Sequence, residues 1–365
     1  MKKKLLLFFI SALLIFESLS ISVFASNVPA ISAKSAILVD QSGNVLFEKD
    51  ADERMLIAST TKLMTALVVL ENCNLSDTFV IEQKHISVEG SSMYLKSGEE
   101  ISVRELLYGL LLSSGNDAAS ALAYHTSGSV EAFVKLMNKK ARKLGLENTS
   151  FENPHGLDSE KHYSSARDLA VIMSEALKNE EFVRISSTSH ITIGGRTLTN
   201  HNKLLTTCDG VISGKTGFTK KAGRTLVSCC KRSGMTLICV TLCDPDDWND
   251  HSNLYEWGFS EFKSYSACDA TKEISPVSVI TGQKDTVSIS VKNKKNFLFR
   301  ADDIITTKTI LPKFVYAPVK AGETAGRVEI YINGKYKESI SLIYAESVSR
   351  EKPGRNVFRI FDFGI

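Results

Sequence analysis

Ser59 and Lys62 are the first residues of this sequence whose types and spacing suggest chemistry. On a helix, side chains three residues apart project from the same face. A serine hydroxyl becomes a strong nucleophile when a base takes its proton, and a lysine can serve as that base if burial or a nearby positive charge lowers its pKa. The pair predicts a nucleophile and its base, although roughly one or two such spacings arise by chance in a chain of this length.

A second pair of polar side chains, Ser114 and Asn116, flanks Gly115 between two apolar segments. This spacing places two hydrogen-bonding groups on a tight turn. On its own it fits an ordinary helix-capping turn equally well, with either side chain satisfying amides at a helix end.

The triplet Lys215-Thr216-Gly217 is much rarer at average composition. Gly214 and Gly217 permit close approach of another backbone, so we expect the triplet on an edge strand beside a cleft. There the positive charge of Lys215 would lower the pKa of Lys62 and so disfavour its protonated form. Thr216 would offer its hydroxyl to a substrate carboxylate.

The segments between these motifs have helical spacing of apolar residues, and the segment after Lys62 is apolar on all sides, as in a buried helix. Strand-like segments lie before and after this helical region, several of them joined by glycine-rich turns. We predict helices at residues 62–71, 103–112, 117–125, 130–144 and 166–177, and strands at 36–39, 45–47, 191–193, 196–199, 225–229 and 236–242.

This pattern predicts an α/β domain of the α+β kind, in which both ends of the segment form an antiparallel sheet around a helical insert. Beyond residue 270 only short alternating segments remain, and Asn333-Gly334 joins two of them as a hairpin turn. A small all-β sandwich is therefore expected there. The predicted boundaries are a signal peptide at 1–25, a catalytic domain at 30–265, the sandwich at 270–346 and a basic and aromatic tail at 347–365.

The first 25 residues have the pattern of a secretory signal, with Lys2 to Lys4 before an apolar run and small residues at 23–25. We therefore expect an exported protein. Removing these residues lowers the net charge from +3 to +1, which argues against a nucleic-acid partner.

Seven cysteines occur at positions 73, 208, 229, 230, 239, 243 and 268. The odd number and the length of the chain argue against a disulfide scaffold. The four from 229 to 243 lack the usual spacing of metal ligands and lie in apolar segments, so we interpret them as buried small side chains. We expect no metal and no cofactor.

In the order Ser-x-x-Lys, Ser-x-Asn and Lys-Thr-Gly, the three motifs resemble the signatures shared by penicillin-binding proteins and serine β-lactamases. Their surroundings resemble more narrowly the low-molecular-mass D-alanyl-D-alanine carboxypeptidases. The resemblance extends from about Ala33 to Phe259, and the β-rich part beyond it looks like the second domain of these enzymes. The segments that carry it are ASTTKLMT at 58–65, GSSMYL at 90–95, LSSGNDAA at 112–119, NPHGLD at 153–158, YSSARD at 163–168 and GVISGKTGFT at 210–219.

The resemblance implies an exported serine peptidase of DD-peptidase and β-lactamase-like fold, acting at the cell wall or the outer face of the cytoplasmic membrane. It would remove the terminal D-alanine from peptidoglycan stem peptides ending in D-Ala-D-Ala, through an acyl-enzyme that β-lactams also form. It assigns roles as follows: Ser59 as nucleophile, Lys62 as base, Ser114 and Asn116 as the second catalytic pair, Lys215, Thr216, Gly217 and Phe218 as the substrate-binding strand, and the amides of Ser59 and Phe218 as the oxyanion hole.

Other conspicuous residues have structural interpretations. We expect His155 to fix a loop and Arg167 with Asp168 to brace the start of a helix, while His201 is a candidate for lining the cleft. Relatives have a basic residue for the substrate carboxylate after the sheet strands, where this chain has the acidic segment 244–248. Arg224 is the remaining candidate to help Thr216 there.

Two alternatives stay open at this point. A serine β-lactamase would use the same acylation, but Gly115 replaces the aspartate usual in that class and no Glu-x-x-Leu-Asn segment follows. A non-hydrolytic β-lactam sensor or wall-binding protein would be indicated by loss of a signature residue, and none is lost. The tail offers at most a weak, reversible contact with a membrane surface.

Overall fold

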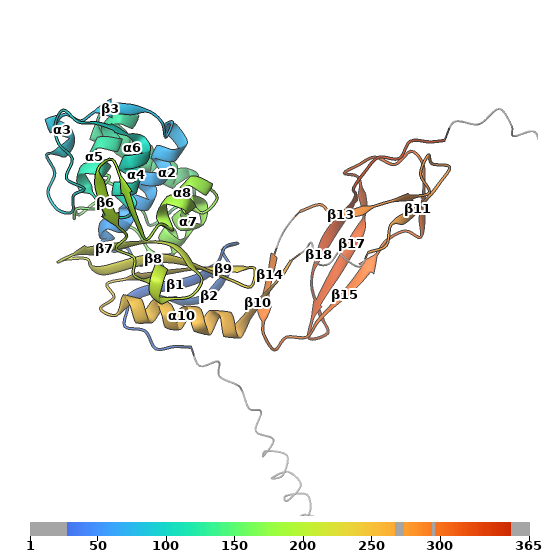
Figure 1. Cartoon of the computed structure of the whole chain (residues 1–365). Helices are drawn as coiled ribbons and strands as arrows, with labels where there is room; N and C mark the ends of the chain where they lie inside the picture. The colour runs from blue at the N-terminus through green and yellow to red at the C-terminus, as the bar shows by residue number, and fades with distance from the viewer. Residues whose placement is uncertain (1–27, 267–273, 294–295, 352–365) are drawn as a thin grey trace, which may run out of the picture.

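The computed structural model describes residues 28–266, 274–293 and 296–351. The predicted signal segment and residues 352–365 of the predicted tail lie outside the described residues. Within the described ranges, none of the helices combines the length and the apolar composition that a bilayer span requires. Figure 1 shows an α/β part that contains the three motifs and an all-β part that follows it.

A five-stranded antiparallel sheet forms the centre of the first part, in the order β2-β1-β9-β8-β7. Because β1 lies between β2 and β9, the two ends of this part of the chain meet in one sheet, as predicted. The triplet Lys215-Thr216-Gly217 lies on β7, at the edge of the sheet, which is also confirmed. The strands are β1 (Ser35–Asp40), β2 (Val45–Lys49), β7 (Val211–Thr219), β8 (Gly223–Arg232) and β9 (Met235–Leu242).

Both faces of this sheet are covered. Successive strand residues point to opposite faces of the sheet. Ile238 and Val240 therefore join the core between the sheet and the helical region, whereas Leu237 and Cys239 join the core between the sheet and α10 (Asp247–Glu261). This burial on two sides explains why β9 is apolar along its whole length. In Figure 1 the long helix α10 lies below the sheet, and α2 to α8, within residues 62–186, lie above it.

The helical region confirms the five predicted helices within a few residues at each end. A short 3-10 turn, η1 (Ala58–Thr61), leads into α2. Serine caps begin α4, α6 and α7, from Ser102, Ser129 and Ser165. The helices are α2 (Lys62–Asn72), α3 (Gln83–Ile86), α4 (Val103–Leu111), α5 (Asn116–Ser127), α6 (Val130–Lys143), α7 (Ala166–Ala176), α8 (Glu180–Ser186) and α9 (Leu204–Thr207).

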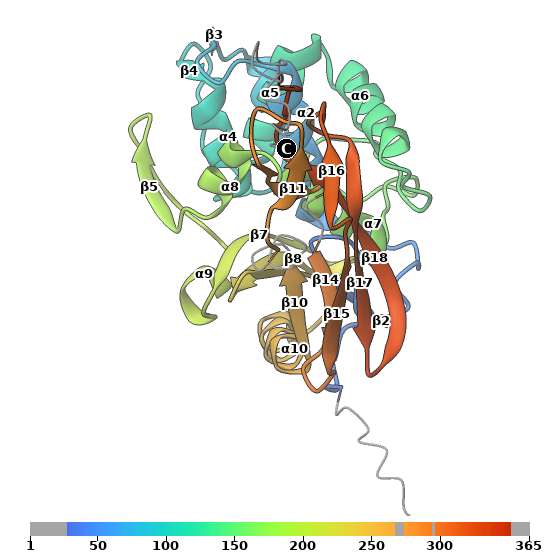
Figure 2. The same cartoon turned by 90° about the vertical axis from the view of Figure 1, so that its right-hand side faces the viewer.

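Two expectations need correction. The predicted strands near residues 191–199 form β5 (His190–Ile193) and β6 (Arg196–Thr199), which pair only with each other and stand apart from the central sheet. They extend beside the helical region (Figure 2). Helix α10 was not predicted, because its buried face includes Asp247, Asp250 and His251 and so lacks a plain apolar pattern. A further pair, β3 (Thr78–Val80) and β4 (Glu100–Ser102), borders the helices.

The second part contains only strands among its described residues. The turn Asn333-Gly334 has φ values of 50° and 76°, so both residues adopt the left-handed conformation of the predicted hairpin. Buried valines of β11 and β12 pack with Ala325 and Tyr344 of the larger sheet. The strands are β10 (Phe262–Ser266), β11 (Val277–Ile280), β12 (Thr286–Val287), β13 (Ile289–Val291), β14 (Asn296–Arg300), β15 (Ile305–Ile310), β16 (Phe314–Tyr316), β17 (Thr324–Ile332) and β18 (Lys335–Tyr344).

Candidate active site

The three motifs meet at an open cavity of about 600 Å³ between the edge strand β7 and the helical region. We call it the central cavity. Ser59 from η1, Ser114 from the turn before α5 and Thr216 from β7 all line it. Residues more than 150 positions apart in the sequence thus surround one space, as the sequence analysis predicted.

Lys62 lies behind Ser59 and is fully buried. Its Nζ donates to Ser59 Oγ at 2.9 Å, to Asn116 Oδ1 at 2.8 Å and to the His155 carbonyl oxygen at 2.6 Å. Burial lowers the pKa of Lys62 well below its ordinary value, and the positive charge of Lys215 lowers this pKa further. A neutral amine beside the serine hydroxyl is the form that can accept its proton.

Two glycines permit the approach of Ser59 to the surrounding backbone. Gly156 packs against the Ala58 carbonyl group so closely that a Cβ at this position would collide with it. A Cβ on Gly217 would lie 2.9 Å from the amide nitrogen of Ser59. Strand β7 can therefore reach the serine only because residue 217 has no side chain.

The second motif connects both lysines. Asn116 is the first residue of α5, its Oδ1 accepts from Lys62, and its Nδ2 donates to the Glu89 carbonyl oxygen at 2.6 Å. Ser114 has φ of 58°, and its Oγ accepts from Lys215 Nζ at 3.0 Å. Ser114 and Asn116 therefore hold their side chains toward different lysines.

Lys215 is almost fully buried on β7 and also donates to the Thr216 carbonyl oxygen at 2.8 Å. Burial lowers the pKa of Lys215 to about 7. The next residues on the strand, Thr216 to Phe218, line the cavity, and Phe218 is largely exposed at its rim.

Arg224 also lines the cavity, opposite Phe218 in the ladder of β7 and β8. Its Nε and Nη2 donate to Asp247 at 2.7–3.0 Å, and its guanidinium lies 5.3 Å from the centre of the Trp248 ring. Asp247 and Trp248 belong to the acidic segment 244–248, which stands where the resemblance suggested a basic residue for the substrate carboxylate. This segment thus orients Arg224 in the cavity.

The histidines follow the sequence interpretation. His155 contributes its carbonyl group to Lys62, while its Nδ1 accepts from the Leu157 amide at 3.3 Å. Burial, with a smaller effect from the charge of Lys62, lowers the pKa of His155 to about 3. His155 is therefore a neutral loop residue, whereas His201 lines the cavity. The contact between Lys62 and the 155 carbonyl group was not predicted, because no sequence pattern reports a carbonyl position.

Arg167 and Asp168 brace the start of α7, as expected. Arg167 pairs with Asp52 at 2.8 Å and with Glu48, and Asp168 accepts from Asn148 and Thr149. Of the predicted buried thiols, those of 229, 230 and 239 are fully buried, and 243 is partly exposed. Among the described residues, no group of three metal-ligating side chains comes together.

Comparison with known proteins identifies the family. A family model described as D-alanyl-D-alanine carboxypeptidase matches residues 22–246. A second, described as the C-terminal domain of penicillin-binding protein 5, matches residues 259–350. The two matches cover most of the chain.

Individual relatives agree with these models. D-alanyl-D-alanine carboxypeptidase DacF of Bacillus subtilis is 33% identical in an alignment that covers 84% of this chain and 83% of that protein. DacA of Escherichia coli is 33% identical in an alignment that covers 95% of this chain and 90% of that protein. The structure of penicillin-binding protein 5 from Haemophilus influenzae is 33% identical, covers 88% of this chain and 99% of that one, and has a TM-score of 0.72. The chain therefore belongs to the D-alanyl-D-alanine carboxypeptidase family of penicillin-binding proteins, which confirms the fold and the enzyme class that its motifs predicted.

Proposed function

We propose that this enzyme removes the terminal D-alanine from peptidoglycan stem pentapeptides through an acyl-enzyme on Ser59. The observation that carries the proposal is the 2.9 Å contact between Lys62 Nζ and Ser59 Oγ in a site where burial favours the neutral amine. A base within hydrogen-bonding distance of the hydroxyl is what nucleophilic catalysis by serine requires.

In the first step Lys62 takes the proton of Ser59, and Oγ attacks the carbonyl carbon of the penultimate D-alanine. The amides of Ser59 and Phe218 stabilise the negative charge on the carbonyl oxygen. The C–N bond then breaks, the leaving amine takes from Lys62 the proton that came from Ser59, and D-alanine departs. Water attacks the ester in the second step, restoring the serine. A β-lactam ring acylates the same hydroxyl.

We assign the terminal carboxylate of the substrate to Thr216 and Arg224. The Thr216 hydroxyl and the Arg224 guanidinium line the same cavity as Ser59. Asp247 accepts hydrogen bonds from Nε and Nη2 of Arg224. Because a guanidinium has five N–H donors in a planar fork, the same group can also bind the substrate carboxylate. The assignment gives this chain a carboxylate site at Arg224 on β8.

Peptidoglycan lies outside the cytoplasmic membrane, so we place the enzyme there, at the cell wall or the outer membrane face. The basic and aromatic residues after Glu351 would give a weak, reversible contact with anionic lipid. Residues just before them belong to the folded part: Val348 is buried and pairs with Val319, and Arg350 pairs with Gly282.

The test uses the protein without residues 1–25 and a pentapeptide ending in D-Ala-D-Ala. We expect release of D-alanine and covalent labelling by a fluorescent penicillin, and we expect Ser59→Ala to abolish both. Ser76→Ala, in an exposed loop, is the matched serine control and should retain both activities. Undiminished labelling of the Ser59 variant would refute the assignment.

A further inference from the structure

A long irregular loop contributes Ser91 to the lining of the central cavity. Residues 87–99 connect α3 to β4 without any helix or strand of their own. We call residues 89–99 the wall loop, since Ser91 within it lines the cavity. A segment without a hydrogen-bonded ladder depends on side chains from other elements to fix its shape.

The inner side of the wall loop is fastened to the start of α5. Asn116 donates from its backbone to the Ser91 carbonyl oxygen at 2.7 Å and from Nδ2 to that of Glu89. Asp117, which is buried, accepts from the amides of Met93 and Leu95 at 3.0 and 3.1 Å. The loop thus packs directly on the residue that holds Lys62.

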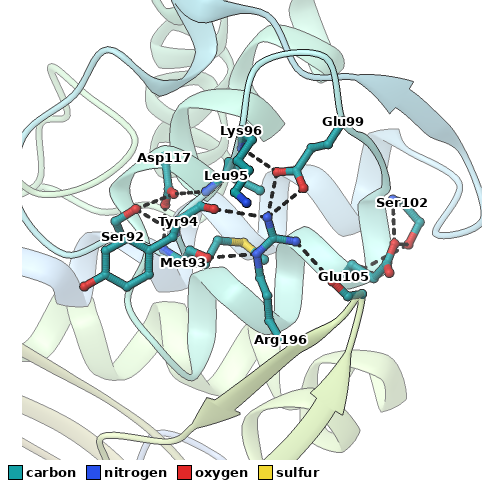
Figure 3. A network of polar contacts seen from close by, with 11 residues as sticks. Ser92, Met93, Tyr94, Leu95, Lys96, Glu99, Ser102, Glu105, Asp117 and Arg196 are labelled. Atoms are coloured by element: carbon teal, nitrogen blue, oxygen red, sulfur yellow. Dashed lines mark hydrogen bonds and ion pairs between the residues drawn. The ribbon is translucent and has the colours of Figure 1, made fainter.

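The outer side is fastened by Arg196 of β6 (Figure 3). Its Nε donates to the Met93 carbonyl oxygen at 3.0 Å, and its Nη2 donates to that of Tyr94 at 3.1 Å. The same Nη2 lies 2.7 Å from both carboxylate oxygens of Glu99. Glu99 in turn accepts from the Lys96 amide at 2.6 Å. One guanidinium therefore bridges the middle and the end of the loop.

Arg196 holds the loop where its backbone is strained. Tyr94 has φ of 61°, in the left-handed region that bulky residues avoid, and its side chain is 80% exposed. No burial of the ring offsets this conformation. The arginine binds the carbonyl groups on both sides of the Tyr94 α-carbon, which opposes relaxation of the loop to an ordinary conformation.

The hairpin that carries Arg196 also leads to the cavity. Strands β5 and β6 pair only with each other, and an isolated hairpin is marginally stable. Thr199, at the end of β6, and His201 line the same cavity as Ser91. The contacts of Arg196 therefore connect two segments that both line the cavity.

We propose that Arg196, paired with Glu99, is a positioning residue for acylation: it holds the wall loop against Asn116 and thereby keeps Asn116 in contact with Lys62. The connection runs from Arg196 through the loop to the carbonyl groups of Glu89 and Ser91, which bind Asn116, whose Oδ1 accepts from Lys62 Nζ at 2.8 Å. This inference rests on the proposed roles of Ser59 and Lys62.

The test measures kcat and KM for the pentapeptide and the rate of labelling by fluorescent penicillin in the wild type, Arg196→Met, Arg196→Lys and Glu99→Gln. Small displacements of catalytic groups lower rates strongly, so we expect Arg196→Met to lower kcat and the labelling rate roughly 10- to 100-fold. KM should change less than threefold, because Arg196 does not line the central cavity. Arg196→Lys, which keeps the charge but lacks the fork, should recover only part of the rate.

The double variant Arg196→Met, Glu99→Gln should be no slower than Arg196→Met alone, because the two residues act as one unit. Arg104→Met is the matched control, since Arg104 likewise pairs with a glutamate, Glu181, at 2.6 Å and does not line the central cavity. It should leave kcat unchanged.

Labelling of the wild type and its loss in Ser59→Ala establish the underlying function separately. The inference fails if Arg196→Met labels within twofold of the wild type, or if Arg104→Met is slowed as much. If Arg196→Met does not fold, the rates of Glu99→Gln and Arg196→Lys decide, and wild-type rates in both would overturn the proposal.

Discussion

Replacing Lys215 by methionine should stabilise the protein at neutral pH while destroying its activity. Burial places the pKa of Lys215 at about 7, whereas the ordinary value is 10.5. At a pH between these two pKa values, Lys215 is protonated in the unfolded chain and neutral in the folded protein. Protonation therefore favours unfolding, so this lysine makes the free energy of unfolding fall as the pH drops from 10.5 toward 7.

The size of the effect follows from the two pKa values. At pH 7 the lysine destabilises the folded state by about 4 kcal/mol, and at pH 9.5 by about 1.5 kcal/mol. Methionine has a similar shape and no charge, but it loses the hydrogen bonds to Ser114 Oγ and the Thr216 carbonyl oxygen, at about 1 kcal/mol each. The variant should be more stable than the wild type by about 2 kcal/mol at pH 7, and about equal to it or slightly less stable at pH 9.5.

Urea unfolding followed by tryptophan fluorescence measures this difference. Both tryptophans of the chain, Trp248 and Trp257, lie on α10, so the signal reports the domain that contains Lys215. Comparison of variant and wild type at each pH cancels the titration of the groups that Lys215 does not influence. Loss of its charge raises the pKa of the buried Lys62, which adds to the stabilisation of the variant in the same direction. A stability difference that is the same at pH 7 and pH 9.5 would refute the reasoning, and so would a variant that is less stable at pH 7.

The remaining predictions concern the substrate carboxylate and the tail. Arg224→Met combined with Asp247→Asn, which leaves no buried carboxylate unpaired, should lower kcat/KM roughly 10- to 100-fold for a peptide ending in a free carboxylate, the loss of a charge-assisted hydrogen bond. It should have little effect on the same peptide with an amidated end, and equal losses on both peptides would exclude a carboxylate site. A chain ending at Glu351 should lose the weak sedimentation with anionic vesicles that we expect for the mature protein at low salt. Equal sedimentation of the two would exclude the tail as the lipid contact.

Local patterns in the sequence were sufficient for much of the fold. The apolar run after Lys62 predicts a buried helix, and α2 is buried from Lys62 to Val69. The dipeptide Asn333-Gly334 predicts its hairpin because few other residues tolerate two successive left-handed conformations. The three motifs likewise identify the chemistry, since their residue types and order are informative without coordinates.

Helix α10 could not be read from its sequence because its buried polar residues have partners far away in the chain. Asp247 binds Arg224, Asp250 accepts from the Ser32 amide at 2.6 Å, and His251 contacts Ser228 and Thr241. Because these three side chains keep hydrogen-bond partners within the protein, they can be buried without leaving polar groups unsatisfied. Their positions therefore break the apolar period on which sequence prediction depends.

The same reason limits prediction of the active site. The sequence determines that Ser59, Lys62, Asn116 and Lys215 are present and in which order they occur. Only the tertiary structure decides that both lysines are buried and that the main-chain carbonyl oxygen of His155 faces one of them. A pKa depends on the burial and the charges around a group, and these are set by segments distant in sequence that the fold brings together.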